Sequence, residues 1–535
     1  MPVDTGWKIW ESGPWELGVR TMADPINIPQ GMLARAEGVE FDTEGLVTKR
    51  SGRARWNTLA ISGSVALDHI AEYVVTTPTS GAASFMVISS GKLWKGDANA
   101  FVSQMGGHAN FGASPIPDFA QMLATAGAQI GKDVFLGVSG VAGEPPFYWV
   151  SGGSVTDIAT PAPTGGVSCC VAGQRFWVAA NMTIYWSEVG DPMTFLSASS
   201  LTINSSDGQR IICIRPSGTN ILVLKERGVH FFPVAVAATP ASTSVTRVRA
   251  SVGNVALHTV TPAQVDDDYW FLTQDLDIAA LSELAQTGDY KPTTKSYTVM
   301  PTLQTLSRAS SDAYLKRAAA CKYGKKSKYL FAGATGSQTQ NGTLVVLNYR
   351  RPDGHIIAAV DPNLPPLASL FESINGNVYG GGYDGFLYTL DTGQTDSVLG
   401  VSTAITGLIE TGWSDFSTAR VSLAYAMKQV KAIEVYVKGT GDFSLACVVE
   451  VGGVEEDAAG LSGTFITGDT VTLSKAVGTG LGGYQILGSN INAPPGRLHN
   501  IRLSNAADAP AFNIHKILVY YEVTGSIVAL TGSET

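Results

Sequence analysis

The chain has 535 residues, of which 44% are hydrophobic and 15% charged, and it contains 59 glycines. This length suffices for two or three domains with packed cores, and the composition fits turn-rich β structure better than a helical enzyme. The formal net charge of −9 argues against a general nucleic-acid coat, which needs an excess of lysine and arginine, but it does not exclude DNA passing nearby.

Residues 1–60 are expected to form an amino-terminal arm that carries one short hairpin. Within this arm, residues 36–52 have the pattern of a strand, a turn closed by Gly45, and a second strand that ends in basic residues. Taken alone, this pattern indicates an ordinary hairpin.

No segment has the pattern of a signal peptide or a membrane span. Charged residues are scattered among the apolar positions of the first twenty residues. The longest apolar stretch, residues 229–241, is interrupted by two prolines and is too short to cross a bilayer. We therefore expect a soluble protein made in the cytosol. Its cysteines lack metal-binding spacing and are expected to be reduced, partly buried thiols: Cys169, Cys170, Cys213, Cys321 and Cys447.

Between residues 80 and 395 one unit recurs about seven times. Each copy is a short apolar strand, a turn rich in glycine, serine, asparagine or aspartate, and a second strand ending in aromatic or branched apolar residues, which is the pattern of a hairpin. A period of roughly 40 to 50 residues is typical of β-propeller blades. The residues that mark the copies are Trp94, Trp149, Trp186, Phe231, Ile278, Val346 and Leu387.

These repeats predict an all-β fold with a β-propeller over residues 61–400. Radial stacking would bury strands that no single blade could bury alone, and it leaves only short, protected edges. The alternative is two or three successive β-sandwiches, whose strands also come at short intervals. The copies are too irregular to fix the number of blades.

A wide gap between Ile278 and Val346 contains two further features. Residues 307–320 fit a short amphipathic helix or an extended strand, and we expect the helix. The densest basic cluster of the chain follows, around Gly324, and it is either a solvated hairpin turn or a contact with DNA phosphate or an acidic neighbouring subunit. Its members are Lys322, Lys325, Lys326 and Lys328.

From about residue 401 the repeat ends and long alternating strands begin. Ile433, Val435 and Val437 share one face of such a strand, whereas Glu434 lies on the other face. Half-buried strands of this kind predict a separate carboxy-terminal β-sandwich, resembling a jelly roll, over residues 401–535.

The sequence contains no zinc-protease, P-loop, nucleophile-elbow or dinucleotide-binding motif. Residues 137–140 come nearest to a nucleophile elbow but lack its final glycine, so a hairpin turn is the better interpretation. The seven histidines are scattered without metal-binding spacing. The acidic residues around position 270 could hold Ca²⁺, but turn capping explains them better: Asp266, Asp267, Asp268, Asp275 and Asp277. We predict no enzyme activity, no cofactor and no metal site.

Two stretches resemble tail proteins of short-tailed bacteriophages. The first is the hairpin over residues 31–52, and the second runs through residues 174–195 and continues over 207–212 and 222–229. The second stretch combines an aromatic strand, a turn ending in Gly190, Asp191 and Pro192, and two further apolar strands. This succession resembles the family called tail nozzle, tubular tail protein B or head-to-tail stabilisation proteins.

The resemblance implies a structural virion protein with no catalytic turnover. It implies a propeller-bearing protomer of a hexameric ring at the distal end of a short tail, synthesised and assembled in the host cytoplasm. The lumen would retain and then pass double-stranded genomic DNA without sequence specificity. Expected neighbours are tail adaptor, tail fibre or tail needle proteins.

Physical arguments are compatible with that interpretation. A closed propeller is a rigid block, and blocks with one heterologous contact generate rings. An acidic wall repels a sliding duplex rather than gripping it.

Two other functions remain open at this point. The chain could be a glycan-binding or glycan-cleaving propeller of a tailspike or adhesin, with Trp94, Trp149 and Trp186 stacking on sugar rings, although their positions at strand ends favour packing within blades. It could also be a cytosolic scaffold that recruits proteins.

Overall fold

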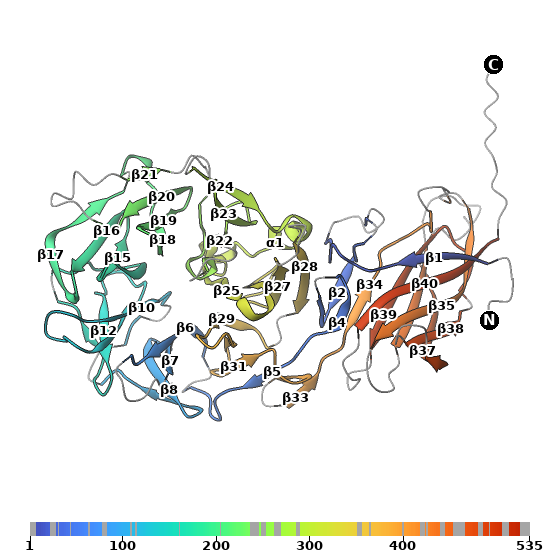
Figure 1. The fold of residues 1–535 in the computed structure, drawn as a ribbon, viewed down its shortest axis with the longest axis horizontal. Helices are drawn as coiled ribbons and strands as arrows, with labels where there is room; N and C mark the ends of the chain where they lie inside the picture. Colours follow the sequence, from blue (N-terminus) through green and yellow to red (C-terminus); the bar gives the residue numbers. More distant parts are fainter. Residues whose placement is uncertain are drawn as a thin grey trace, which may run out of the picture.

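The computed structural model describes most of the chain. The described residues are 7–21, 28–29, 31–42, 44–61, 65–76, 83–106, 110–112, 115–159, 161–203, 205–235, 245–247, 253–261, 269–284, 289–349, 356–362, 365–398, 401–417, 423, 426–438, 445–452, 466–479, 485–491, 493–505 and 513–524. They form a ring of small sheets joined on one side to one larger sheet (Figure 1).

The ring contains seven small sheets among the described residues, and all their strands are antiparallel except for one contact in the last sheet. The first three blades are β6 (Leu67–Val74), β7 (Ala83–Ser89), β8 (Lys92–Asp97) and β9 (Ala100–Ser103); β10 (Asp118–Leu123), β11 (Asp133–Val138), β12 (Phe147–Val150) and β13 (Thr156–Asp157); β14 (Ser168–Ala172), β15 (Arg175–Ala180), β16 (Thr183–Glu188) and β17 (Asp191–Thr202).

The remaining blades follow in chain order around the ring. They are β18 (Ile211–Ser217), β19 (Asn220–Lys225), β20 (Gly228–Pro233) and β21 (Thr246–Arg247); β22 (Tyr269–Leu272), β23 (Ile278–Leu284) and β24 (Asp289–Thr294); β25 (Ala319–Tyr323), β26 (Lys328–Gly333), β27 (Thr343–Asn348) and β28 (Ile357–Pro362); β29 (Leu367–Glu372), β30 (Val378–Gly382), β31 (Leu387–Leu390), β5 (Arg53–Arg55), β32 (Thr395–Val398) and β33 (Val401–Ala404).

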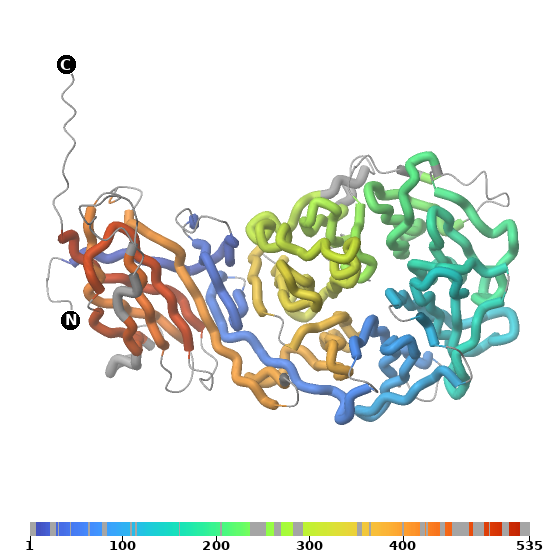
Figure 2. Tube along the Cα trace, turned by 180° about the vertical axis from the view of Figure 1, so that it is seen from behind, coloured from blue at the N-terminus to red at the C-terminus, as the bar shows by residue number. Residues whose placement is uncertain are grey.

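The inner strands of these sheets contact one another around the ring. β10 contacts β14, β14 contacts β18, and β29 of blade 7 contacts β6 of blade 1, which closes the circle seen in Figure 2. Apolar clusters fill the spaces between successive blades. The described chain is therefore a seven-bladed β-propeller, and the propeller prediction is confirmed.

Each of the seven marker residues lies in a different blade, on the third strand from the axis. Blade 5 reaches this pattern in an unusual way. A segment that contains η4 (Leu257–Thr259) takes the inner position, through an isolated bridge between Asn254 and Thr273. Ile278 in β23 therefore corresponds to the third-strand markers of the other blades.

The amino-terminal part of the chain does not form a separate arm. Residues 53–55 form β5, which pairs with β31 and supplies the fourth strand of blade 7. The last blade is thereby completed by a strand from the other end of the propeller sequence. The hairpin within residues 36–52 exists as β3 (Val39–Phe41) and β4 (Val47–Lys49), but it belongs to the larger sheet. Residues 53–55 thus pair within the propeller and residues 47–49 within the larger sheet, through partners that lie far along the chain.

Among the described residues the larger sheet has eleven strands, which come from both ends of the sequence. β1 pairs with β40 from Lys8 opposite Tyr521 to Ser12 opposite Ile517. Its members are β1 (Lys8–Ser12), β2 (Arg35–Glu37), β3, β4, β34 (Leu408–Glu410), β35 (Lys428–Lys438), β36 (Leu445–Gly452), β37 (Ile466–Thr479), β38 (Gln485–Asn490), β39 (Leu498–Asn505) and β40 (Asn513–Val523).

This sheet folds over a single apolar core. Val435 of β35 and Cys447 of β36 belong to one buried cluster, although β37 and β38 separate their strands in the sheet order. β37 pairs with both β36 and β38, so the two halves are continuous. The predicted alternation of Ile433, Val435 and Val437 toward the core is present, but a jelly-roll sandwich of two separate sheets is not confirmed.

Helical structure is sparse among the described residues. It consists of α1 (Met300–Gln304), α2 (Ala309–Asp312), η2 (Ser205–Asp207), η4, η5 (Tyr297–Val299), η6 (Leu315–Arg317) and η7 (Gly324–Lys326). No continuous helix spans residues 307–320, because Ser310 and Ser311 have positive φ angles of 56° that interrupt it. No helix in the described ranges is long and apolar enough to cross a membrane.

Candidate functional site

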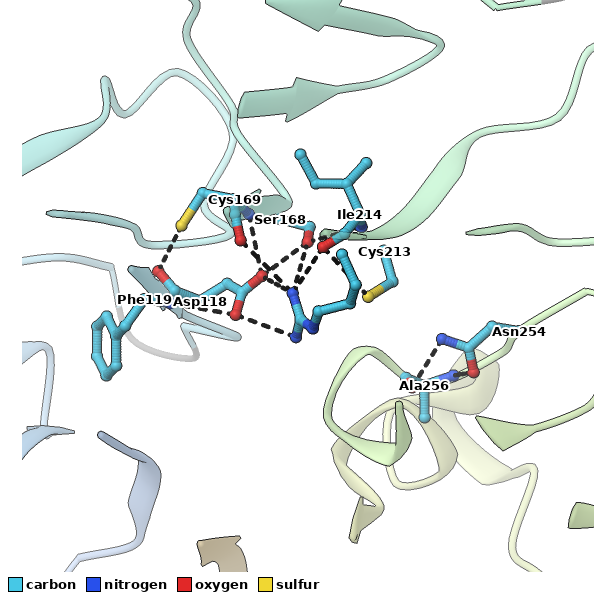
Figure 3. Close-up of polar contacts among 9 residues, drawn as sticks. Asp118, Phe119, Ser168, Cys169, Cys213, Ile214, Asn254 and Ala256 are labelled. Atoms are coloured by element: carbon cyan, nitrogen blue, oxygen red, sulfur yellow. Dashed lines mark hydrogen bonds and ion pairs between the residues drawn. The ribbon is translucent and has the colours of Figure 1, made fainter. Parts of the chain in front are cut away.

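A charged pair of side chains links two inner strands of the propeller, β10 and β18. Asp118 begins the inner strand β10, and its carboxylate accepts two hydrogen bonds from Arg215 of β18, at 2.7 Å and 3.2 Å. The Oγ of Ser168 and the backbone N–H of Cys169, both on β14, donate to the same carboxylate (Figure 3). Three successive blades are thus tied together by one buried ion pair whose carboxylate is hydrogen-bonded from two strands.

Two histidines meet across the same axis. His69 of blade 1 stacks on His258 of blade 5, with ring centroids 4.1 Å apart, although these blades are not neighbours in the ring. Burial lowers the pKa of both rings, that of His69 to about 3, and the nearby Arg215 acts in the same direction. Both rings are therefore neutral near pH 7. At this level the axis holds side chains rather than an open channel.

A small chamber of about 10 Å³ lies beside the histidine pair, on the face where the inner strands begin, which we term the start face. Asp68, His258, Arg317 and Tyr383 contribute to its wall, from four blades or the connections between them. Burial raises the pKa of Asp68 to about 7, while Arg317, 4.0 Å away, opposes the shift. Such a volume suits one water molecule.

The joint between propeller and larger sheet is a second candidate site. β28, the outer strand of blade 6, contributes to two cores at once. Its Ile357 and Ala359 belong to the core of the larger sheet, whereas Ala358 belongs to a propeller core. Successive side chains of a strand point to opposite faces. β28 therefore packs against the propeller with one face and against the larger sheet with the other.

Ion pairs reinforce this joint. Glu40 of β3 accepts bonds from Lys328 at 2.8 Å and Lys326 at 3.1 Å, both from blade 6. Lys326 also reaches Asp391 of blade 7 at 2.6 Å. Burial raises the pKa of Glu40, but the two ammonium groups outweigh it, and its pKa is lowered. The charges are thus satisfied within the chain.

A second ionic layer lies beside the first. Arg50, which follows β4, makes a bidentate pair with Asp396 of β32 at 2.5 Å and 3.0 Å. The backbone N–H of Gly38 donates to Asp361 of β28 at 2.7 Å. Burial raises the pKa of Asp361 to about 6 against the opposing effect of Arg50. Each contact joins the amino-terminal hairpin region to the propeller.

The basic cluster singled out in the sequence therefore lies at this joint. Lys328 is 5% exposed, and Lys326, which lies in the turn η7 with its side chain 34% exposed, pairs with two carboxylates. Lys325 donates to Asn377 of the neighbouring blade, and Lys322 also has an interaction within the chain. The lysine cluster is visible in the sequence, but nothing there indicates that Glu40 is its partner, because Glu40 lies 286 positions away from Lys326.

The tryptophans considered for sugar binding and the turn considered as a nucleophile elbow make contacts within their own blades. Trp149 and Trp186 are buried in blade cores, and the indole N–H of Trp94 donates to Ser89 O within its own hairpin. These rings are not free sugar-stacking platforms. Ser139 of the expected turn accepts the N–H of Val141, which agrees with a turn.

The aspartates considered for Ca²⁺ binding and the cysteines can also be located in the structure, where it describes them. Asp277 accepts bonds from Thr273 and Thr294, which agrees with turn capping, whereas Asp266, Asp267 and Asp268 lie outside the described residues. The five cysteines are buried, and none of them is in a disulfide. No group of three or more potential metal ligands occurs within the described ranges.

Comparisons with known proteins add little to this description. No family model matches the chain, and no curated protein matches it. The chain is similar to the extracellular domain of the putative hybrid two component system BT4673 from B. thetaiotaomicron, with a TM-score of 0.40 and 10% identity. That match covers 63% of this chain and 40% of the other, so the chain spans less than half of that protein's length.

Two smaller propeller-sized structures are similar over the same share of the chain. The WD40 β-propeller domain of Doa1 has a TM-score of 0.39 and 10% identity, and the match covers 63% of this chain and 96% of that chain. YCF48 bound to D1 peptide has a TM-score of 0.37 and 9% identity, with 62% and 96% covered. The fold assignment above rests on the strand order and not on these similarities.

Proposed function

We propose that this chain is a structural protomer of a ring-shaped assembly, and specifically a tail nozzle subunit of a short-tailed bacteriophage. The proposal joins the resemblance of residues 31–52 and 174–229 to nozzle proteins with the construction of the protomer. On this proposal the ring is hexameric, belongs to the virion tail and contacts adaptor, fibre or needle proteins. The chain has no catalytic role in it.

The joint is the observation that carries the proposal. A wall that withstands genome pressure needs protomers that do not bend between domains. Here one strand, β28, packs into both bodies, and ion pairs involving Glu40 and Arg50 join the hairpin to blades 6 and 7. A propeller that is completed by its own amino-terminal strand, β5, adds to this stiffness.

The side chains that fill the centre of the propeller leave no path for DNA through a single protomer. Because His69 and His258 stack across the propeller centre, a duplex would pass between protomers rather than through one of them. The overall charge of −9 suits a lumen wall that does not hold the duplex. Lys326 and Lys328 are committed to carboxylates, so we do not assign them a DNA contact.

Electron microscopy of the purified protein, alone and co-expressed with the other tail proteins of its phage, tests this function. We expect class averages with rotational symmetry around a central hole, and a mass that is a multiple of the protomer's. The charge reversal Glu40→Lys should reduce the yield of rings, whereas Glu144→Lys, at a site remote from the joint, should not. Monomers at high concentration under both conditions would overturn the proposal, and trimers that release reducing sugar from host polysaccharide would replace it with a tailspike.

A further inference from the structure

A cavity of about 500 Å³ opens on the start face of the propeller, separate from the joint. Its walls come from the connections that precede the inner strands of blades 2, 3, 4 and 6, from the inner segment of blade 5, and from the turns between second and third strands of blades 2, 3 and 4. Ile116 lines both this cavity and the small axial chamber below it. Cavities of this size commonly hold small ligands or peptide side chains.

The wall of the cavity is apolar and its rim is charged. Branched aliphatic side chains form the wall, while Arg210, Glu226 and Lys316 contribute charges. No aromatic ring lines the cavity among the described residues, so it lacks the stacking surface that sugars usually need. The branched aliphatic wall residues are Ile116, Val167, Ile211, Ile212, Val255 and Leu257.

Several polar groups here have no strong partner within the described part of the chain. Arg210 and Glu226 form no hydrogen bond or ion pair there, and Lys316 makes only a 3.4 Å bond to the carbonyl of Ser311. In the chamber below, His258 is 7% exposed, and neither of its ring nitrogens has a hydrogen-bond partner among the described residues. Arg210 and Lys316 are exposed, so their charges are available to an anionic ligand, whereas the unpaired nitrogens of buried His258 carry a free-energy cost that a water molecule in the chamber recovers.

We propose that this cavity binds an acidic, aliphatic peptide segment of a partner protein. A leucine-like side chain fills the aliphatic wall, and a carboxylate of the segment pairs with Arg210 and Lys316. Glu226 accepts a backbone N–H of the same segment. A mixed rim of this kind suits a peptide, which offers carboxylates to Arg210 and Lys316 and backbone N–H donors to Glu226, better than a nucleic acid, whose phosphate backbone has no donor for Glu226.

Fluorescence anisotropy with defined peptide pools tests this site on the full-length protein. The probe is a pool of fluorescein-labelled tetrapeptides that contain two leucines and two glutamates in all orders. The matched pools carry lysine or glutamine in place of glutamate. We expect saturable binding of the glutamate pool in the micromolar to millimolar range, and binding at least tenfold weaker for the lysine pool.

Two variants separate this cavity from general charge effects. Arg210→Glu should weaken binding of the glutamate pool at least tenfold, and Ala142→Trp, at an exposed lining position, should block it by filling the cavity. Lys132→Glu makes the same charge change near an exposed turn at the opposite ends of the strands and should leave binding unchanged. Thermal melting of each variant checks that the fold is retained.

The outcomes decide between occupants. Absence of binding for every pool up to millimolar concentration overturns the inference, as does binding that neither Arg210→Glu nor Ala142→Trp reduces. Binding of host polysaccharide that Ala142→Trp abolishes would assign the cavity to a glycan instead. The inference is independent of ring assembly, because a monomer that binds the glutamate pool would still satisfy it.

Discussion

At the scale of single residues, the buried pair of Asp118 and Arg215 has the largest expected effect on stability. Both side chains are almost fully enclosed, at 3% and 10% exposure. Arg215→Met would leave the Asp118 carboxylate buried with Ser168 Oγ and the backbone N–H groups of Phe119 and Cys169 as its remaining donors. Because a lone buried charge is poorly solvated, we expect a loss of about 3–5 kcal/mol in the free energy of unfolding, measured by urea titration.

Two comparisons make this result specific. Adding Asp118→Asn to Arg215→Met removes the uncompensated charge and should restore part of the loss. Arg35→Met breaks an exposed pair with Glu37 and should cost less than about 1 kcal/mol. Equal losses for Arg215→Met and Arg35→Met would show that the axial pair does not stabilise the propeller.

Asp68 gives a pH-dependent prediction. Its pKa is raised by burial from 3.8 to about 7, so the folded state holds this proton more tightly than the unfolded state. The resulting penalty is absent below about pH 4, grows as the pH rises, and is complete above about pH 7. Asp68→Asn should therefore be more stable than the parent at pH 8, on the order of 2–4 kcal/mol, and similar to it at pH 4.

Urea titrations of both proteins at pH 4, 6 and 8 measure this difference. Comparing parent and variant cancels the opposite contribution of His69 and His258, whose lowered pKa values destabilise the fold as the pH falls below about 6.5. Parallel pH profiles for the two proteins would refute the assignment.

The sequence could not predict these residue-level sites. Asp118, Arg215, His69 and His258 belong to different blades, and only closure of the ring brings them together. The lysine cluster was visible in the sequence, but its acidic partner Glu40 was not.

At the scale of elements, the hairpin β3–β4 depends on one glycine. Gly38 precedes β3 with a φ of 63°, and a Cβ atom there would lie 2.3 Å from the backbone O of Thr406. Gly208 has nearly the same φ, 64°, but nothing lies within 4 Å of its added Cβ. An alanine at either position would have the same strained backbone conformation, but only at Gly38 would its Cβ atom clash with a neighbouring atom.

Gly38→Ala should therefore destabilise the protein by several kcal/mol, whereas Gly208→Ala should cost about 1–2 kcal/mol from backbone strain alone. Thermal unfolding together with limited proteolysis between β4 and β5 measures the effect. Similar melting temperatures for both variants would mean that the close approach to Thr406 is unimportant for attaching the hairpin.

The sequence predicted many elements because local patterns determine them. Hairpins around Trp94, Trp186 and Leu387 followed from turn residues between strand formers. The pairing of β5 with β31 and of β1 with β40 could not be foreseen, since each joins segments more than 300 residues apart. Residues 307–320 had helix-like periodicity, but positive φ angles at Ser310 and Ser311 interrupt it.

At the scale of the whole molecule, the proposed function requires the propeller and the larger sheet to move as one rigid body. The chain crosses between them before β5 and again after β33, and β28 packs into both cores. The apolar contacts and the Glu40 and Arg50 pairs together oppose bending at the joint. Periodicity in the sequence identified both bodies approximately but carried no information about the joint.

The distance between the two bodies, measured by double electron–electron resonance, tests this claim most directly. Spin labels at Lys132→Cys in blade 2 and Lys438→Cys at the end of β35 report on each body, and the five native cysteines are buried. The account predicts one narrow distance distribution, which Glu40→Lys broadens and Glu144→Lys leaves narrow. A broad distribution in the protein without a joint substitution would contradict a rigid protomer.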